Sequence, residues 1–426
     1  MKILHTVQMY LPSLGGMQEV VRQLSERLVS RGHEVTVATS YAPERNAKMI
    51  NGVRIREFNV SGNLVAGMQG EVAAYQKFLL ASDFDIITNF AAQQWATDAM
   101  LVVLDQIPAR KVFVPTGFTA LPSFRYRHYF ELMKKWMRHY DMTVFLSDDY
   151  RDINFARDNR IENYRVIPNG ADEKDFLRQS PINIRGKLNI PYDDFLVLHV
   201  GSHTGIKGHR EAIEIFSRAA IENATFLLVG NHSGGCHDAC SGHASRLNAS
   251  AQFRAANKKI IVTSLKREET ISAFQAADLF LFPSNIECSP VVLFEAAASK
   301  TPFLTADVGN AAEIVEWTKG GILLPTYKNT FTETMLNRFV MTLGRLVGHV
   351  TFDKCIPFDS IGMVKVDVPN STFDLEKLYR HKERRHLMAD AGFASWKERF
   401  TWSKIASQYE QLYQTICDTA SKEPVY

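Results

Sequence analysis

Short apolar runs alternate with helical patterns along most of this chain, and that alternation restricts its fold more than any other feature. The runs are rich in Val, Ile, Leu and Phe, and we expect strands to begin at Ile3, Glu34, Val53, Asp85, Lys111, Thr143, Tyr164, Phe195, Thr225, Lys259, Asp278, Pro302 and Gly321. Strands that alternate with helices form parallel sheets covered by helices on both faces. The sequence therefore predicts an α/β protein built from doubly wound parallel sheets.

The expected strands fall into two groups, and the length of 426 residues also suits two domains. We expect a first Rossmann-like domain over 1–172, a polar linker over 173–192 and a second Rossmann-like domain over 193–399. A helical pattern over 400–418 follows the last strand and is expected to pack back on the first domain. Two stretches interrupt the rhythm of the second domain and are interpreted as insertions, near 231–248 and 326–369.

Composition excludes several classes of protein. Apolar residues make up 46% of the chain and charged residues 22%, which argues against disorder, and a net charge of +3 is too small to indicate a nucleic-acid partner. The chain has five cysteines, an odd number that fits a reducing compartment. Neither a secretory signal nor an apolar run of about 20 residues is visible. We therefore expect a cytoplasmic protein.

A strand followed by a proline-initiated helix carries two glutamates separated by seven residues. The strand is expected to end at Pro283, and Glu287 follows in the loop. The helix is expected to begin near Ser289 with Pro290 in its first turn, where the missing N–H costs nothing. Glu295 then lies about one and a half turns into the helix.

The backbone amides at the start of this helix form an expected anion site. The N–H groups of Ser289, Val291 and Val292 have no partner within the helix, and the helix dipole also favours negative charge there. Carboxylates accept hydrogen bonds from hydroxyls while amides bind a diphosphate, so the combination suits a nucleotide sugar. The spacing alone fits equally well a capping carboxylate beside an unrelated surface glutamate.

The spacing of the two glutamates resembles the E-x7-E motif of retaining family-4 glycosyltransferases of the GT-B fold. Other stretches of the chain agree with that family in the same order: Gly15-Gly16, Arg31–Val35, Ile167–Asp172, Val200–Gly208 and Asp307–Val315. The resemblance spans nearly the whole chain. It implies two Rossmann-like domains facing across a cleft. It also implies an enzyme that moves a sugar from a nucleoside-diphosphate donor to a hydroxyl of a saccharide or lipid-linked saccharide.

The resemblance also implies roles for individual residues of the second domain. Glu295 would hold the ribose of the donor, Glu287 the hydroxyls of the transferred sugar, and Lys207 would neutralise the departing diphosphate. The remaining donor-binding positions are the backbone around Ser289, Pro290 and Val291 and the strand end at Gly201 and Ser202.

In the first domain, the glycine pair would let the chain approach a ligand without an intervening side chain. By the same resemblance Gly16 lies toward the donor phosphate, and Gly15 and Thr116 toward the acceptor. A plain turn is the alternative interpretation of the glycine pair.

Two positions depart from the family pattern. Ser202 stands where the family usually has an arginine that contacts the leaving group, and Thr116 stands before Gly117 where many members have a sugar-contacting histidine. His203 is our candidate for a substitute cation beside the diphosphate. These departures leave open a non-catalytic or partner-dependent GT-B scaffold that binds a nucleotide sugar. A sugar phosphorylase or a nucleotide-sugar epimerase is a further alternative.

We expect no metal and no other cofactor. Retaining enzymes of this family are thought to use a donor phosphate oxygen to take the acceptor proton, so they need no carboxylate nucleophile. Asp83-Phe84-Asp85 has the form of a manganese-binding motif, but its place before a strand favours a turn. A group of possible zinc ligands matches no closed zinc pattern and is interpreted as a flexible loop: Cys236, His237, Cys240 and His243.

The stretch 124–140 combines five basic residues with aromatic side chains and a single acid, Glu131. Such a helix can lie on an anionic membrane surface, so peripheral membrane contact is one interpretation. The alternative, which we favour, is a surface helix whose aromatic residues pack on the first domain or line the acceptor site.

Overall fold

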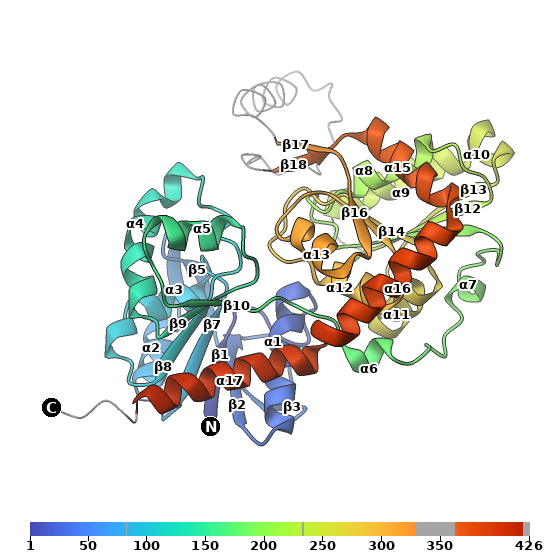
Figure 1. The fold of residues 1–426 in the computed structure, drawn as a ribbon. Coiled ribbons are helices and arrows are strands. Elements are labelled where there is room, and N and C mark those ends of the chain that lie inside the picture. The colour runs from blue at the N-terminus through green and yellow to red at the C-terminus, as the bar shows by residue number, and fades with distance from the viewer. Residues whose placement is uncertain (82, 232–233, 329–362, 421–426) are drawn as a thin grey trace. The chain divides into compact units, whose positions relative to one another are not determined.

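The computed structural model describes residues 1–81, 83–231, 234–328 and 363–420 (Figure 1). The chain forms two compact units, each with its own sheet and hydrophobic core. Unit 1 comprises Met1–Gly170 and Phe400–Tyr426, and unit 2 comprises Ala171–Arg399. The chain therefore passes from unit 1 to unit 2 and returns to unit 1 for its last helix.

Unit 1 is built on an eight-stranded sheet with the order β10-β9-β8-β7-β1-β2-β4-β3. All neighbours in it are parallel except β3 and β4, and β1 pairs with β2 from Lys2 opposite Glu34. The strands of the sheet are β1 (Lys2–Thr6), β2 (Glu34–Ser40), β3 (Met49–Ile50), β4 (Val53–Phe58), β7 (Ile86–Phe90), β8 (Arg110–Val114), β9 (Met142–Phe145) and β10 (Tyr164–Val166). A separate antiparallel hairpin is formed by β5 (Val60–Asn63) and β6 (Gly67–Gly70).

Helices cover the sheet of unit 1. Helix α1 buries Val20, Val21, Leu24 and Leu28, which lie on one face at helical spacing. The α-helices are α1 (Gly16–Ser30), α2 (Val72–Leu80), α3 (Trp95–Leu101), α4 (Arg127–Trp136), α5 (Arg151–Asp158) and α17 (Trp402–Ala420). Short 3₁₀ helices are η1 (Leu104–Gln106), η2 (Phe124–Tyr126) and η3 (Met137–His139).

The last helix, α17, runs beside α1 and the first strands of unit 1 (Figure 1). Glu410 accepts hydrogen bonds from Arg31 at 2.6 Å and contacts His33 Nε2 at 2.8 Å. Tyr413 is buried, and its hydroxyl lies 2.7 Å from Thr88 Oγ1 on β7. These contacts join the end of the chain to its beginning.

Unit 2 is built on a six-stranded parallel sheet with the order β13-β12-β11-β14-β15-β16. Its strands are β11 (Phe195–Val200), β12 (Ala224–Val229), β13 (Lys258–Thr263), β14 (Leu279–Phe282), β15 (Phe303–Thr305) and β16 (Gly321–Leu323). Its helices are α6 (Glu173–Phe176), α7 (Ile184–Lys187), α8 (His209–Arg218), α9 (Gly234–Asn248), α10 (Ala251–Ala255), α11 (Arg267–Ala276), α12 (Val291–Ala298), α13 (Ala311–Thr318), α15 (Val368–Arg380) and α16 (Lys382–Arg399). An antiparallel pair is formed by β17 (Thr326–Lys328) and β18 (Val364–Val366).

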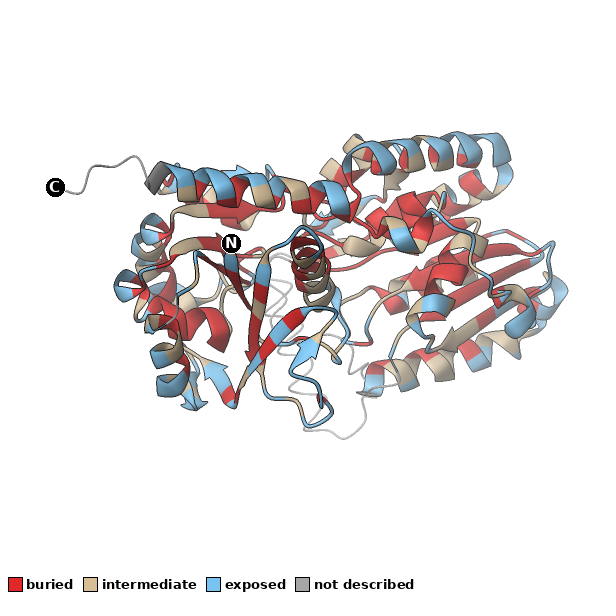
Figure 2. Ribbon diagram, turned by 90° about the horizontal axis from the view of Figure 1, so that it is seen from below, coloured by how far each residue is buried: buried red, intermediate tan, exposed pale blue. Residues whose placement is uncertain are grey.

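The strands of both sheets are largely buried, whereas the covering helices bury one face and expose the other (Figure 2). Central strands such as β12 are buried along their whole length because helices lie on both faces. None of the helices in the described ranges is both long and apolar enough to cross a bilayer.

The predicted fold class is confirmed, and every predicted strand is present with its first residue within one position of the prediction. Two expectations about segments need correction, and a third falls mostly outside the described residues. Residues 173–192 are part of unit 2 rather than a linker, because α6 and α7 pack on α11 and Ser180 N donates to Gln275 Oε1 at 2.7 Å. The expected irregular stretch near 231–248 is mostly helix α9. The other expected insertion, 326–369, holds β17 and β18 at its ends, and its central residues 329–362 lie outside the described ranges.

Candidate functional site

The strand order of unit 2 reverses between β11 and β14, and this reversal locates the candidate site. The chain adds strands outward from β11 through β12 to β13, then returns to the other side of β11 with β14, β15 and β16. Ligands of doubly wound sheets bind beyond the carboxyl ends of the two strands at such a reversal. The loops there are β11–α8, which carries Lys207, and β14–α12, which carries Glu287.

Lys207 and Glu287 face each other across the two loops. Lys207 Nζ lies 2.7 Å from Glu287 Oε1, and the same oxygen accepts a hydrogen bond from Ser284 Oγ at 2.8 Å. The side chains retain 26% and 10% of their exposure. The structure thus brings together an acid and a base that are 80 positions apart in the sequence.

The two loops are in direct backbone contact. Gly208 has a φ of +72°, and a Cβ at this position would lie 1.9 Å from the carbonyl oxygen of Pro283. Asn285 N donates to Ile206 O at 2.9 Å, which closes the contact from the other side. Only glycine adopts this conformation without cost and leaves room for the neighbouring chain. The contact between the two loops therefore positions the backbone next to Lys207 against the loop that carries Glu287.

Helix α12 begins two residues later than the sequence predicts. Its first residue is Val291, and Pro290 is the N-cap in extended conformation. Ser289 is buried and precedes the cap. The N–H groups of the first turn of any helix lack intrahelical partners, so α12 offers amides beside the Lys207–Glu287 pair. Its N-terminal end is the expected anion site.

The segment before α12 is held by the loop after β15. Asn310 N donates to Cys288 O at 2.9 Å. Gly309 has a φ of +57°, and a Cβ there would lie 2.3 Å from the same oxygen. The glycine of the Asp307–Val315 motif therefore serves to position the loop that carries Glu287.

Glu295 is buried inside unit 2 and forms an ion pair that the sequence analysis missed. Its Oε1 accepts from Arg267 Nη1 at 2.5 Å, and Arg267 also contacts Asp175 Oδ2 through Nε at 3.1 Å and Nη2 at 2.8 Å. The guanidinium lies over the ring of Phe176, 5.6 Å from its centroid. No sequence signal links these residues, because they come from α6, α11 and α12. The contact with Arg267 holds the Glu295 side chain in place, and carboxylate oxygens accept hydrogen bonds from hydroxyls.

Gly201, Ser202 and His203 follow β11 at the same edge of the sheet. A Cβ at Gly201 would lie 3.2 Å from Lys207 Cβ, so this glycine lies against the lysine stem. His203 is buried, and its ring stacks on that of His209 with centroids 4.2 Å apart. The ring also lies against the backbone of Gly230 at the end of β12. A role for His203 at a diphosphate stays a prediction.

The remaining predicted positions, Gly15, Gly16 and Thr116, belong to unit 1. Gly15 is the N-cap of α1 and Gly16 is its first residue. Thr116 follows β8 with a φ of +58°, a conformation that strains a β-branched residue. The next residue is tied down, since Gly117 N donates to Asp152 Oδ2 at 2.8 Å. Burial raises the pKa of Asp152 to about 6.

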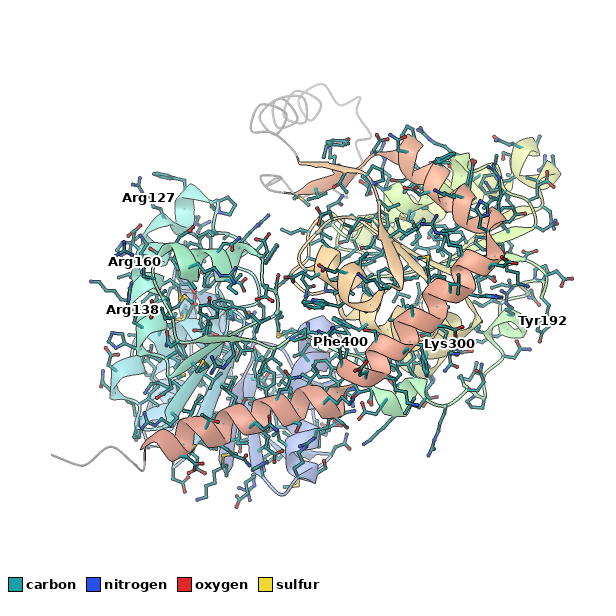
Figure 3. All side chains as sticks on the ribbon, in the orientation of Figure 1. Arg127, Arg138, Arg160, Tyr192, Lys300 and Phe400 are labelled. Atoms are coloured by element: carbon teal, nitrogen blue, oxygen red, sulfur yellow. The ribbon has the colours of Figure 1, made fainter. Side chains whose placement is uncertain are left out.

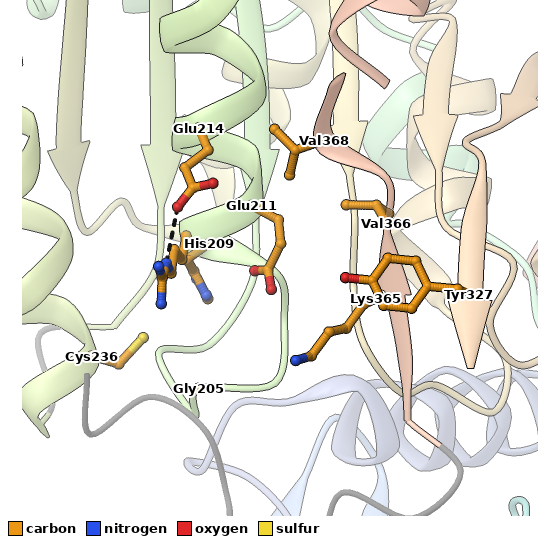
Figure 4. Close-up of a pocket in the computed structure, with 10 residues that line it drawn as sticks. Gly205, His209, Glu211, Glu214, Cys236, Tyr327, Lys365, Val366 and Val368 are labelled. Atoms are coloured by element: carbon orange, nitrogen blue, oxygen red, sulfur yellow. Dashed lines mark hydrogen bonds and ion pairs between the residues drawn. The ribbon is translucent and has the colours of Figure 1, made fainter. Parts of the chain in front are cut away.

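A pocket of about 210 Å³ in unit 2 lies between the first half of α8 and the β17–β18 pair (Figure 4). It is lined by Gly205, His209, Arg210, Glu211, Glu214, Cys236, Tyr327, Lys365, Val366 and Val368. Burial raises the pKa of Glu211. The Lys207–Glu287 pair and the start of α12 are not among its lining residues, so this pocket is separate from the candidate site.

Two motifs of the sequence have structural roles. Arg31 and His33 bind Glu410 and so hold α17 on unit 1. Asp83 and Asp85 both contact Lys2: the Asp83 carboxylate pairs with the Lys2 ammonium, and Asp85 Oδ2 accepts a hydrogen bond from the backbone N–H of Lys2 at 2.7 Å. Asp83-Phe84-Asp85 therefore forms the turn before β7, as its position in the sequence indicates.

Two protein-family models match the chain. "Glycosyltransferase Family 4" matches residues 14–175, and "Glycosyl transferases group 1" matches residues 182–337. The first match lies in unit 1 and the second in unit 2, apart from a few residues at the crossing. The second match includes both glutamates and Lys207.

Curated proteins and solved structures agree with these matches. The chain is 24% identical to the D-inositol 3-phosphate glycosyltransferase of Acidothermus cellulolyticus, over 80% of this chain and 81% of the relative. It is 20% identical to the N-acetyl-alpha-D-glucosaminyl L-malate synthase of Bacillus anthracis, over 95% of both chains. Sucrose-phosphate synthase from Thermosynechococcus elongatus superimposes with a TM-score of 0.73 at 17% identity, over 98% of this chain and 99% of that one. Anabaena HepE, solved with UDP and glucose, gives a TM-score of 0.70 at 16% identity, over 97% of this chain and 100% of that one.

The two family matches together run from residue 14 to residue 337, with a short gap. Together with the relatives, they show that the chain is an enzyme. The chain is a glycosyltransferase of family 4 with the GT-B fold.

Proposed function

We propose that this glycosyltransferase takes a sugar from a nucleoside-diphosphate donor bound on unit 2 and transfers it, with retention of anomeric configuration, to a hydroxyl of a saccharide or lipid-linked saccharide. The donor class is supported by HepE, which was solved in complex with UDP and with UDP-glucose. The acceptor class is supported by an Escherichia coli relative named as an O-antigen biosynthesis glycosyltransferase, 22% identical over 59% of this chain and 55% of that relative.

The observation that carries the proposal is the Lys207–Glu287 pair beside the N-terminal end of α12. When the bond between the anomeric carbon and the diphosphate oxygen breaks, negative charge develops on the leaving diphosphate. A fixed ammonium and a helix N-terminus stabilise that charge more in the transition state than in the bound donor. Lys207 has three N–H donors, so it can keep Glu287 as one partner and bind a phosphate oxygen with another.

The two glutamates have different tasks in this proposal. Glu287, held by Lys207 and Ser284, accepts hydrogen bonds from hydroxyls of the sugar being transferred. Glu295, held by Arg267, accepts from the ribose hydroxyls of the nucleotide. Ser289, Pro290 and Val291 contribute backbone to the diphosphate site.

The proposal of retention rests on the resemblance to retaining family-4 glycosyltransferases, and the contacts of Glu287 fit it. Glu287 is engaged by a lysine and a hydroxyl, which favours a positioning role over attack on the anomeric carbon. In the proposed step the acceptor oxygen forms the new bond on the face that the diphosphate leaves, and its proton passes to a departing phosphate oxygen. Lys207 and the α12 amides neutralise the diphosphate, so transfer should proceed without added Mg²⁺ or Mn²⁺.

The acceptor is proposed to contact unit 1 at Gly15 and Thr116, and Gly16 is proposed to lie toward the donor phosphate. The strained φ of Thr116 supports this proposal, because such strain persists where function requires a particular backbone path. Among the described residues, nothing beyond its chain neighbours and its own helix lies within 4 Å of a Cβ added at Gly16, so a ligand has room there. A Cβ added at Gly15 would lie 2.6 Å from the Gln18 side chain.

The experiment that tests the donor site measures nucleotide affinity. We expect Glu295→Ala to weaken binding of UDP or a UDP-sugar, followed by calorimetry, by at least about tenfold, which corresponds to one lost charge-assisted hydrogen bond of roughly 1.5–3 kcal/mol. Glu316→Ala, an exposed glutamate of α13, is the matched control and should bind normally. The melting temperature without nucleotide identifies any variant that has simply unfolded. Full affinity in folded Glu295→Ala would remove the donor-site assignment, and a screen of other nucleotides guards against choosing the wrong base.

Peripheral membrane contact is proposed for the start of the 124–140 segment. Tyr129, Phe130 and Met133 of α4 are buried in unit 1, so these aromatic and apolar side chains are part of the core. Phe124 is 86% exposed, and its neighbours Arg125 and Arg127 are exposed as well; Figure 3 shows Arg127 at the surface of unit 1. An exposed aromatic ring flanked by arginines suits an anionic lipid surface that presents a lipid-linked acceptor.

Vesicle sedimentation tests this contact. The wild-type protein should sediment with vesicles of anionic lipid at low salt, and Arg125→Glu with Arg127→Glu should reduce the bound fraction several-fold, because each basic residue near the surface contributes about 1 kcal/mol. Arg254→Glu with Lys259→Glu makes the same charge change on exposed residues of unit 2 and serves as the control. Equal loss in both double variants would show a general charge effect and overturn the assignment.

A further inference from the structure

Three side chains of types that can bind a metal ion lie close together in unit 2, beside the β11–α8 loop. A ring nitrogen of His203 and the sulfurs of Cys236 and Cys240 all lie within 4.8 Å of one another. The two cysteines are one turn apart on α9, so their thiols share a face of the helix. His203 lies in the loop after β11, and β11 is the neighbour of β12, the strand that precedes α9. All three side chains are buried.

The imidazole of His203 makes no hydrogen bond to any residue that the structure describes. Both ring nitrogens are buried, and only 6% of the residue is exposed. Burying such polar atoms unsatisfied costs about 1–3 kcal/mol. The ring is nevertheless held in place, since His203 N donates to Asn231 Oδ1 at 2.7 Å and the ring stacks on His209. An unsatisfied imidazole fixed beside two sulfurs is the arrangement of a metal ligand set.

The chemistry of the set selects the metal. Two thiolates and one imidazole are soft to borderline ligands, which favour zinc over the magnesium or manganese that bind to oxygen. The two negative charges of the thiolates neutralise one divalent cation, so the buried site is uncharged overall. Both cysteines are thiols rather than parts of a disulfide, as such ligands require.

We propose that His203, Cys236 and Cys240 bind one zinc ion through the imidazole and two thiolates, with the fourth tetrahedral position left to a small exogenous ligand. Binding releases the two thiol protons to solvent. His237 lies outside the proposed set, since its Nδ1 is 3.3 Å from Asp238 Oδ1, although its ring is 5.2 Å from that of His203. The metal occupies a position distinct from the Lys207–Glu287 pair.

The site would tie α9 to the loop that carries Lys207. His203 is four positions before Lys207 in the same loop, and Gly201 lies against the lysine stem. A zinc ion bridging His203 to α9 therefore limits the movement of the β11–α8 loop.

The first experiment measures metal content. Untagged full-length protein is purified under reducing conditions, freed of metal with a chelator, loaded with Zn²⁺ and dialysed, and its zinc is counted by mass spectrometry. We expect about one zinc ion per chain in the wild type. In the double variant Cys236→Ser with Cys240→Ser, the zinc content per chain should be lower by about tenfold or more. Cys417→Ser, a cysteine of α17 in unit 1, is the matched control and should retain zinc. The proposal fails if the wild type retains no more zinc than the double variant, or if Cys417→Ser loses as much.

The second experiment uses the wild type as its own reference and so does not depend on how the variants fold. Titration of the metal-free protein with Co²⁺ should produce a sulfur-to-cobalt charge-transfer band, which Zn²⁺ then abolishes by displacement. Zinc should also raise the melting temperature of the wild type, because a ligand that binds the folded state stabilises it. Absence of the charge-transfer band overturns thiolate ligation. Both readouts are independent of sugar transfer, so their failure leaves the proposed function standing.

Discussion

At the scale of single residues, the ion pair of Lys207 and Glu287 is better explained by function than by stability. Both side chains keep some exposure, and ion pairs of this kind contribute about 0–1 kcal/mol to folding. A lysine held at 2.7 Å from a carboxylate beside a helix N-terminus is instead well placed to receive a second anion. The pair of Glu295 with Arg267 differs, because only 5% of the Glu295 side chain is exposed and removing the arginine would leave a buried carboxylate.

We predict that Lys207→Met lowers kcat/KM by roughly 10²–10³, the range observed when one fixed stabiliser of developing charge is removed. The physical reason is that the leaving diphosphate loses a fixed positive charge. Nucleoside-diphosphate release, measured against acceptor concentration, reports the change. Lys259→Met removes an exposed lysine of β13 and should leave the rate unchanged. A Lys207→Met enzyme with wild-type kcat/KM would exclude a direct role for this lysine.

At the scale of elements, glycines at close approaches set the position of the site loops. Gly208 admits the backbone of Pro283, and Gly309 admits that of Cys288. Gly208 belongs to the Val200–Gly208 motif and Gly309 to the Asp307–Val315 motif, both of which resemble motifs of the glycosyltransferase family. In the structure, the contribution of both glycines is to packing. The Arg31–Val35 motif is similar, since Arg31 and His33 hold α17.

We predict that Gly208→Ala destabilises unit 2 and weakens donor binding. The new Cβ would lie 1.9 Å from a carbonyl oxygen, so the loops must separate, and overpacking of this kind costs typically about 1–3 kcal/mol. Gly242→Ala, inside α9 with only the tip of Arg246 nearby, is the control and should stabilise the helix by roughly 0.5–1 kcal/mol. Urea unfolding and nucleotide calorimetry on both variants provide the measurements. Equal stability of the two variants would contradict the close approach.

At the scale of the whole molecule, each unit buries a neutral histidine at the centre of its sheet. His5 of β1 is fully buried, and its Nδ1 lies 2.8 Å from Ser25 Oγ while its Nε2 lies 3.3 Å from Tyr413 Oη. Burial lowers the pKa of His5 to about 3, and it also lowers the pKa of His199 on β11. The unfolded chain binds protons at these histidines at higher pH than the folded chain does.

We predict that stability falls as the pH is lowered from about 6.5 toward 3, because in this window the unfolded state binds more protons at His5 than the folded state. Between pH 7.5 and 5.5 the contribution of His5 should be roughly 1 kcal/mol. His5→Gln cannot titrate, so its loss of stability over the same interval should be smaller by that amount. Hydrogen exchange of peptides from β1 measures the stability of unit 1 separately. An identical pH dependence in wild type and variant would show that other groups dominate.

The sequence predicted the strands well for a local reason. A strand buried on both faces must be apolar along its length, so β11, β12 and β14 can be recognised without knowledge of their neighbours. Segments stabilised by distant contacts were not recognised. The 173–192 segment reads as a polar linker, but Arg185 reaches the carbonyl of Ala276 and the carboxylate of Asp278. Helix α9 was expected to be irregular because its Gly and Cys residues are weak helix signals.

For the site, the sequence by itself determined which residue types are present and in what order, including both glutamates, Lys207 and a helix that starts at a proline. The resemblance of that order to a family then implied a sugar nucleotide. Only the tertiary structure decided which of these residues are in contact. It brings Lys207 to Glu287 and Arg267 to Glu295. It also brings His203 close to Cys236 and Cys240. The physical reason is that parallel strands bring loops from distant parts of the chain to one edge of a sheet, and such proximity leaves no trace in local spacing.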